Sequence, residues 1–183
     1  MLTIKPQPGA SVLATSSQGS LTIFPKEAPK KKSAERSYTL LAEPVDARDA
    51  NVISWPGEYD YGGMTIRGLA QNGDAHVSYV VTTDGLRCGF LSSPLGSWNE
   101  QEIELLGDLD VLVIPAENAK LVQTIVEEVD PPVVIPLPGK DPKVYKEVLQ
   151  ACGAKETAPV SEVKLKKGSL PSDSRAVYVL ETD

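Results

Sequence analysis

The sequence predicts a single α/β domain over residues 1–183, in which a β-rich first half precedes alternating strands and helices in packed layers. Three segments support this fold class. Asp84-Gly85 is a strong hairpin signal between two apolar runs. The run Val111–Ile114 is wholly apolar, which is typical of a buried parallel strand. Residues 119–129 place their apolar side chains on one face of a helix, which predicts a layer of helix against sheet.

The first half is predicted to consist of short strands bounded by turn residues. These expected strands cover residues 1–5, 11–15, 21–24, 37–42, 52–54, 64–69, 77–83 and 86–91. A polar segment rich in lysine and proline, Pro25–Arg36, is expected to be a loop. Pro56–Gly63 is expected to be a turn-rich connector between two of the strands.

The second half is predicted to alternate strands with helices. Asn99 is the expected N-cap of a helix that runs to Leu106. Asp141 and Pro142 begin a later helix as its N-cap and first residue, and Gly153 ends it. The expected strands of this half cover residues 111–114, 133–137, 163–165 and 176–180.

Charge and composition limit the classes of function. The chain has 18 Lys and Arg against 25 Asp and Glu, and its net charge is −7. Such an acidic surface argues against nucleic acid and anionic membranes as partners. No apolar run approaches the roughly 18 residues of a membrane span, and no export signal is visible. Two cysteines without a disulfide framework suit a reducing compartment, so the expected location is cytoplasmic.

Five segments resemble, in order, a known family. Val52–Ile66, which contains PGEYDYGG, resembles a segment of small metallo-β-lactamase-fold proteins, in the branch that includes relatives of ascorbate-6-phosphate lactonase. Tyr79–Gly89 is similar to the next hairpin of that family, Leu105–Pro115 and Val133–Pro136 to two of its strands, and Thr22–Pro25 to an early strand. The resemblance covers nearly the whole chain. It implies a metallo-β-lactamase-like αβ/βα sandwich, trimmed of some peripheral helices.

The resemblance also implies where metal ligands would lie, and the chain lacks them there. The first motif of the family, His-x-His-x-Asp-His, falls on Thr39–Asp46, which has no histidine. The next histidine falls on Ala70–Gly73, the bridging aspartate on Phe90–Gly96, and the last histidine on Pro138. A dinuclear site needs about five to seven donor groups. The sequence therefore predicts no metal, no cofactor and no catalytic residue.

Isolated residues with chemical potential have simpler interpretations. The single histidine, His76, has no His or Cys partner at short spacing, so we expect a surface or hydrogen-bonding role. Glu58 and Asp60 are a conceivable acid–base pair, but their position in the PGEYDYGG segment favours a role in the connector. Cys88 and Cys152 are expected to be small buried hydrophobic residues.

Two features are candidate interaction surfaces. Lys30, Lys31 and Lys32, with Lys26 and Arg36, form a basic patch on an acidic protein, and the alternative is a solvated loop. Trp55 and Trp98 lie on predicted connectors, where each is either core filling or part of an interface. We select Trp98 as the candidate aromatic anchor for a partner.

The sequence thus predicts a non-catalytic metallo-β-lactamase-fold protein that acts as a binding or assembly subunit. Its expected partner is a protein, either a second copy of the chain or a catalytically intact relative. Two alternatives stay open. One is a hydrolase whose site uses carboxylates or ligands from a partner. The other is a binder of a small molecule or nucleotide in the cleft where the family has its active site.

Overall fold

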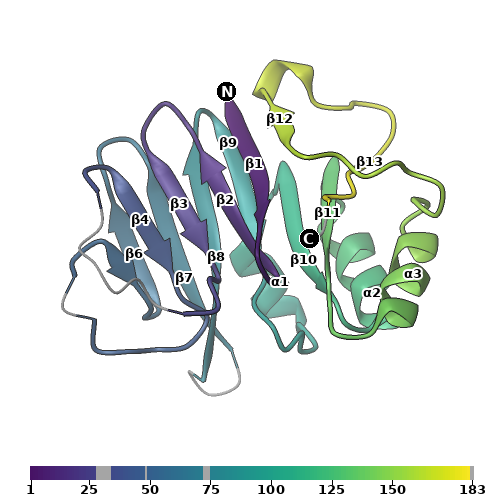
Figure 1. The fold of residues 1–183 in the computed structure, drawn as a ribbon, viewed down its shortest axis with the longest axis horizontal. Coiled ribbons are helices and arrows are strands. Elements are labelled where there is room, and N and C mark those ends of the chain that lie inside the picture. Colours follow the sequence, from purple (N-terminus) through teal and green to yellow (C-terminus); the bar gives the residue numbers. More distant parts are fainter. Residues whose placement is uncertain (28–33, 48, 72–74, 182–183) are drawn as a thin grey trace.

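Two β-sheets lie face to face, and helices cover the outer side of one of them (Figure 1). This architecture comes from a computed structural model that describes residues 1–27, 34–47, 49–71 and 75–181. The two mixed sheets and their few helices form the α/β sandwich that the sequence predicts.

The first sheet combines the N-terminal strands with one late strand. Its members are β1 (Leu2–Gln7), β2 (Ser11–Thr15), β3 (Ser20–Ile23), β4 (Ser37–Leu40), β5 (Val52–Ile53) and β12 (Val163–Leu165). Their order across the sheet is β12-β1-β2-β3-β4-β5. β1 is antiparallel to both β2 and β12, whereas β4 is parallel to β3 and β5.

The second sheet contains a parallel half and an antiparallel half. Its members are β6 (Gly57–Asp60), β7 (Thr65–Gln71), β8 (His76–Thr83), β9 (Leu86–Phe90), β10 (Val111–Ala116), β11 (Val133–Pro138) and β13 (Ala176–Val177). Their order is β13-β11-β10-β9-β8-β7-β6. The pairs from β9 to β13 are parallel, and the pairs from β6 to β9 are antiparallel.

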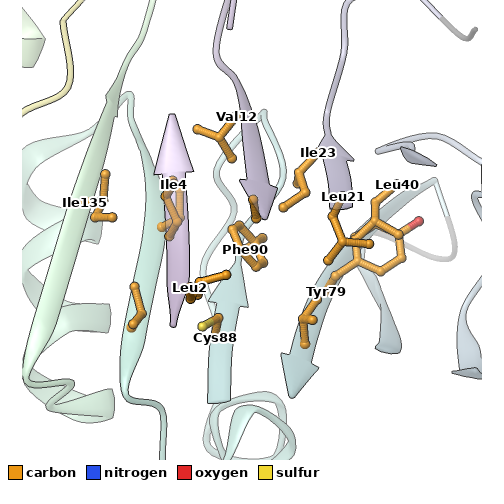
Figure 2. Packing of buried hydrophobic residues seen from close by; sticks show 14 of the residues in the cluster. Leu2, Ile4, Val12, Leu21, Ile23, Leu40, Tyr79, Cys88, Phe90 and Ile135 are labelled. Carbon is orange, nitrogen blue, oxygen red and sulfur yellow. The ribbon is translucent and has the colours of Figure 1, made fainter. Parts of the chain in front are cut away.

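The main core lies between the two sheets. Figure 2 shows Leu2, Ile4, Val12, Leu21, Ile23 and Leu40 of the first sheet facing Tyr79, Cys88, Phe90 and Ile135 of the second. Burial of one such side chain stabilises the fold by about 1.5–3 kcal/mol. The Tyr79 hydroxyl donates to the carbonyl of Leu41 at 2.7 Å, which satisfies the one polar group of this large buried ring.

A second core lies between the second sheet and the helices α1 (Glu100–Leu106), α2 (Ala119–Val129) and α3 (Pro142–Ala151). β10 supplies both cores, because Val111 and Val113 face the main core while Leu112 and Ile114 face the helices. This alternation explains why the whole strand is apolar, as the sequence predicts for a strand covered on both faces. Within the described residues the longest helix has 11 residues, well short of the roughly 20 that a membrane span needs.

Local signals in the sequence fix several element ends. Asn99 and Glu102 form a capping box, in which each side chain accepts from the backbone N–H of the other, at 3.0 and 2.8 Å. Asp141 caps α3 by accepting from the Lys143 N–H at 2.8 Å. Asp84 and Gly85 have φ values of 51° and 75°, as a two-residue hairpin turn requires. These predictions are confirmed.

Two predicted ranges are wrong. The connector Pro56–Gly63 contains strand β6, which pairs with β7 from Gly57 opposite Gly68 to Asp60 opposite Thr65. Pairing with a neighbour overrides the turn-rich composition of this segment. The predicted strand 176–180 is limited to β13, and Leu180 forms only an isolated bridge with Val160.

Candidate functional site

A cleft of about 960 Å³ opens at one end of the sandwich. It lies between the turn that joins β1 to β2 and the segments that follow β10 and β11. The residues that line it are Lys5, Pro6, Gln7, Pro8, Gly9, Ala10, Ser11, Lys26, Ser93, Glu117, Leu137, Pro138, Gly139, Lys140, Pro142, Tyr145, Ser161, Leu180 and Glu181. The carboxyl ends of the parallel strands β9, β10 and β11 lead to this end, which is where open α/β sheets commonly place a ligand.

An inner pocket of about 170 Å³ adjoins this cleft. Its walls are formed by Ala10, Phe24, Pro25, Ala42, Leu91, Ser93, Pro115 and Leu137. Ala10, Ser93 and Leu137 line both spaces, so the pocket is a continuation of the cleft. Ser93 supplies the one side-chain hydroxyl in an otherwise apolar wall.

The stretches that the resemblance assigned to metal ligands meet at this place. Ala42, Ser93 and Pro138, from three of these stretches, line the cleft or its inner pocket. Gln71, from the fourth, accepts from the Ser78 hydroxyl at 2.8 Å, and Ser78 in turn accepts from the Ser92 N–H at 2.9 Å. Four stretches that are far apart in the sequence thus converge on one end of the sandwich.

The fold has solved neighbours, although no protein-family model and no curated protein matches the sequence. A metallo-β-lactamase superfamily protein from Thermotoga maritima aligns over 100% of both chains, with a TM-score of 0.77 and 16% identity. Igni18, a metallo hydrolase from Ignicoccus hospitalis, aligns over 90% of this chain and 99% of its own, with a TM-score of 0.60 and 12% identity. This chain has the metallo-β-lactamase fold. YhfI, a protein of the same fold from Bacillus subtilis, aligns over 82% of this chain and 93% of its own, with a TM-score of 0.57 and 12% identity.

The metallo-β-lactamase fold of this chain surrounds a donor set that does not fit a metal ion. Among the described residues, no three His, Cys, Asp or Glu side chains lie close enough together to hold one. Glu117 lines the cleft, but its two carboxylate oxygens accept from the Ser93 hydroxyl and from the Leu95 N–H. The other charged groups on the described part of the wall are three lysines and Glu181. Ammonium groups repel cations, so this wall does not suit zinc or iron.

The lysines of the cleft differ in their partners. Lys5 forms an ion pair with Glu162 at 3.0 Å. Lys26 and Lys140 are exposed, and neither has an ion-pair partner within the described part of the chain. Sequence reasoning placed Lys26 in the basic patch of the segment Pro25–Arg36, although not in a cleft, and it missed Lys140. The available signal was their position, because each follows by two or three residues the end of a predicted strand in the resembled segments.

The other predicted chemical residues are not among the described residues that line the cleft or its inner pocket. His76 begins β8 opposite Gln71, and its Nδ1 atom is buried without a hydrogen-bond partner among the described residues. Glu58 lies on β6 and forms an exposed ion pair with Arg67 at 3.6 Å. Cys88 is buried, and Cys152 is half-buried. Burial raises the pKa of both thiols, which disfavours the reactive thiolate form.

The candidate interaction residues have contrasting positions. Lys30, Lys31 and Lys32 lie outside the described residues. Trp98 is 8% exposed and belongs to the core beneath the helices, so its ring fills the core; its role as an anchor for a partner stays a prediction. Trp55 is the exposed tryptophan, at 50%. It lies between β5 and β6, where the chain crosses from the first sheet to the second.

Proposed function

We propose that this chain is a non-catalytic binding protein with the metallo-β-lactamase fold, and that the cleft is its ligand site. The observation that carries the proposal is the combination of an open cleft with a wall whose described residues offer no metal-binding donor set. Hydrolysis by a metal-activated water needs several converging ligands and an open coordination position. A cleft of about 960 Å³ needs neither in order to bind a molecule.

Glu117 is the residue most relevant to the catalytic alternative. As the carboxylate beside Ser93, it is the candidate for a general base. Its other oxygen accepts from the Leu95 N–H at 2.7 Å, so the carboxylate orders the 93–95 segment. The single histidine, His76, is not among the described residues that line this wall, and no described serine–histidine hydrogen bond activates Ser93.

Metal analysis of the purified protein tests the proposal. We expect zinc, iron and manganese far below one equivalent, and a melting temperature that EDTA leaves unchanged, because no native-state ligand is removed. Near-stoichiometric metal, or a drop of several degrees with EDTA, would contradict the proposal. That outcome would favour the alternative of a hydrolase with an unconventional or partner-completed site.

We also propose that the chain associates with a protein, in the first place a second copy of itself. The supporting observation is an exposed apolar pair beside edge strand β6, formed by Trp55 and Val45 at 50% and 39% exposure. The Trp55 indole N–H donates to the Val45 carbonyl at 3.1 Å, which orients the ring. Exposed aromatic rings with fixed geometry are common anchors of protein interfaces.

Light scattering over a range of protein concentrations tests this association. We expect a dimer mass that Trp55→Ser shifts to the monomer, while Leu105→Ser, at an exposed leucine on α1, leaves the mass unchanged. A monomer at every concentration would contradict self-association.

The unpaired cysteines are in keeping with the cytoplasmic location that we propose for this protein.

A further inference from the structure

The cleft has an apolar interior. Leu91, Pro115 and Leu137, which are buried, form much of the inner wall together with Phe24 and Ala42. Burying a compact apolar group against such a wall is favourable, because apolar surface is removed from water. Burying a charged group there is unfavourable, because the group loses its hydration. The inner end therefore suits the hydrocarbon part of a ligand.

The mouth of the cleft has the opposite character. Lys26 and Lys140 are exposed there without an ion-pair partner among the described residues, whereas Lys5 is paired with Glu162. The acidic groups on the wall are Glu117, whose oxygens are held by Ser93 and the Leu95 N–H, and Glu181. Among the described residues of this mouth, free ammonium groups thus outnumber free carboxylates, although the chain as a whole carries a net charge of −7.

We propose that the cleft binds an organic anion, a small molecule with an apolar body and a carboxylate or phosphate head. The body lies in the inner pocket against Leu91 and Leu137, and the head meets Lys26 and Lys140 at the mouth. Charge-assisted hydrogen bonds to the head fix the orientation, and an apolar pocket with a few polar groups is the usual form of a small-molecule site. This inference rests on the proposed binding function and names its ligand class.

The test uses anilinonaphthalene sulfonate, a fluorescent anion with an apolar body, on the folded full-length protein. We expect saturable binding that weakens about tenfold in the double variant Lys26→Ala/Lys140→Ala, the loss expected for two ionic contacts at an exposed mouth. Lys146→Ala is the matched control, since Lys146 lies on α3 but does not line the cleft. Equal affinity in the double variant and the control would overturn the proposal.

Competition identifies the head group. Phenyl phosphate and phenylacetate should displace the probe, and the stronger of the two identifies phosphate or carboxylate as the preferred head. Benzyl alcohol, which lacks a charge, and inorganic phosphate, which lacks an apolar body, should compete at least tenfold more weakly. Equal competition by benzyl alcohol would overturn the anion assignment while leaving the binding function intact.

A variant that fills the inner pocket tests the location. Ala42→Phe should abolish probe binding while both lysines remain, with circular dichroism used to check that the variant is folded. Full binding by folded Ala42→Phe would overturn the placement of the apolar body.

The measurement of probe binding is repeated with EDTA and with added zinc. Binding that needs zinc would overturn the proposed function as a metal-independent binding protein. This outcome differs from equal competition by benzyl alcohol, which would overturn only the ligand class.

Discussion

The two ends of the sandwich differ in whether their charged side chains have binding partners. At the end formed by the turns 16–19 and 84–85, here called the hairpin end, polar groups of the two sheets bind one another. Asp84 accepts from the Ser17 N–H at 3.1 Å and from the N-terminal ammonium at 2.8 Å, while the Gln18 side chain accepts from the Thr83 hydroxyl at 2.8 Å. At the cleft end, Lys26 and Lys140 bind no described acidic group.

The same strands connect these two ends. β9 begins just after the turn at Asp84 and ends at Phe90, and the segment that follows it reaches the cleft at Leu91 and Ser93. The hairpin end therefore links the two sheets by direct polar contacts. In this fold the polar contacts of Asp84 and Thr83 between the sheets and the lysines left available for a ligand lie at opposite ends of the strands.

The largest expected effect is at the middle of the sandwich, which supports both ends. Ile114 on β10 is fully buried, and Ile114→Ala should lower the free energy of unfolding by about 2–5 kcal/mol. Leu170→Ala is the comparison, because Leu170 is only half-buried, at the end of the short 3₁₀ helix Lys167–Ser169. Urea unfolding measures both. Equal losses at the two sites would show that β10 is not buried on both of its faces.

The next effect is at the hairpin end. Asp84→Asn removes a charged acceptor that serves donors from two other segments, so the free energy of unfolding should fall by about 1–3 kcal/mol. Asp173→Asn, at an exposed position, should change it by less than about 0.5 kcal/mol. If both variants unfold at the same urea concentration as the parent protein, the hairpin end does not hold the sheets together.

Acidification probes the same carboxylate without mutation. Burial raises the pKa of Asp84, but hydrogen bonds from the N-terminal ammonium and Ser17 outweigh it and hold that pKa below its usual range. A carboxylate whose pKa is lowered in the folded state contributes its full stabilisation at pH values above its pKa in the unfolded chain, about 3.9. This stabilisation is lost as the pH falls through the pKa of the folded state. The stability difference between parent and Asp84→Asn should stay constant from pH 7 to about pH 5 and shrink below about pH 4. A difference that grows on acidification contradicts this sign.

The smallest effect on stability is expected at the cleft end. Lys140→Ala should change the free energy of unfolding by less than about 0.5 kcal/mol, because the exposed ammonium has no ion-pair partner among the described residues to lose. Thermal unfolding measures this directly. A loss comparable with that of Asp84→Asn would mean that the two ends are stabilised alike.

Local sequence signals predicted most of the scaffold. Some features depend only on residues that are close together in the sequence, so a short pattern predicts them. These are the apolar run of β10, the Asp84-Gly85 turn and the caps at Asn99 and Asp141. β6 was missed because Gly57 and the glycines after it read as a turn, and only its pairing with β7 makes it a strand.

The cleft was harder to predict than the strands. The ordered resemblance indicated which stretches lack metal ligands, and three of them line the cleft or its inner pocket. Lys26 belongs to the lysine-rich segment Pro25–Arg36, but Lys140 comes from another loop, and only the folded sheets bring the two residues to one mouth. The contrast between buried Trp98 and exposed Trp55 was equally hidden, because irregular connectors have no periodicity that relates position to burial.

The pairing of β1 with β12 has a consequence for synthesis on the ribosome. β2 follows β1 closely in the sequence and pairs with one of its edges. The other edge of β1 pairs with β12, which is synthesised much later, with Leu2 opposite Leu165 and Ile4 opposite Val163. Until that late segment leaves the exit tunnel, one edge of the growing sheet is open to strands of neighbouring nascent chains. Of the charged residues at this seam, Lys5 on β1 is already present at that stage, and a charged side chain on an open edge strand disfavours pairing with an apolar strand of another chain.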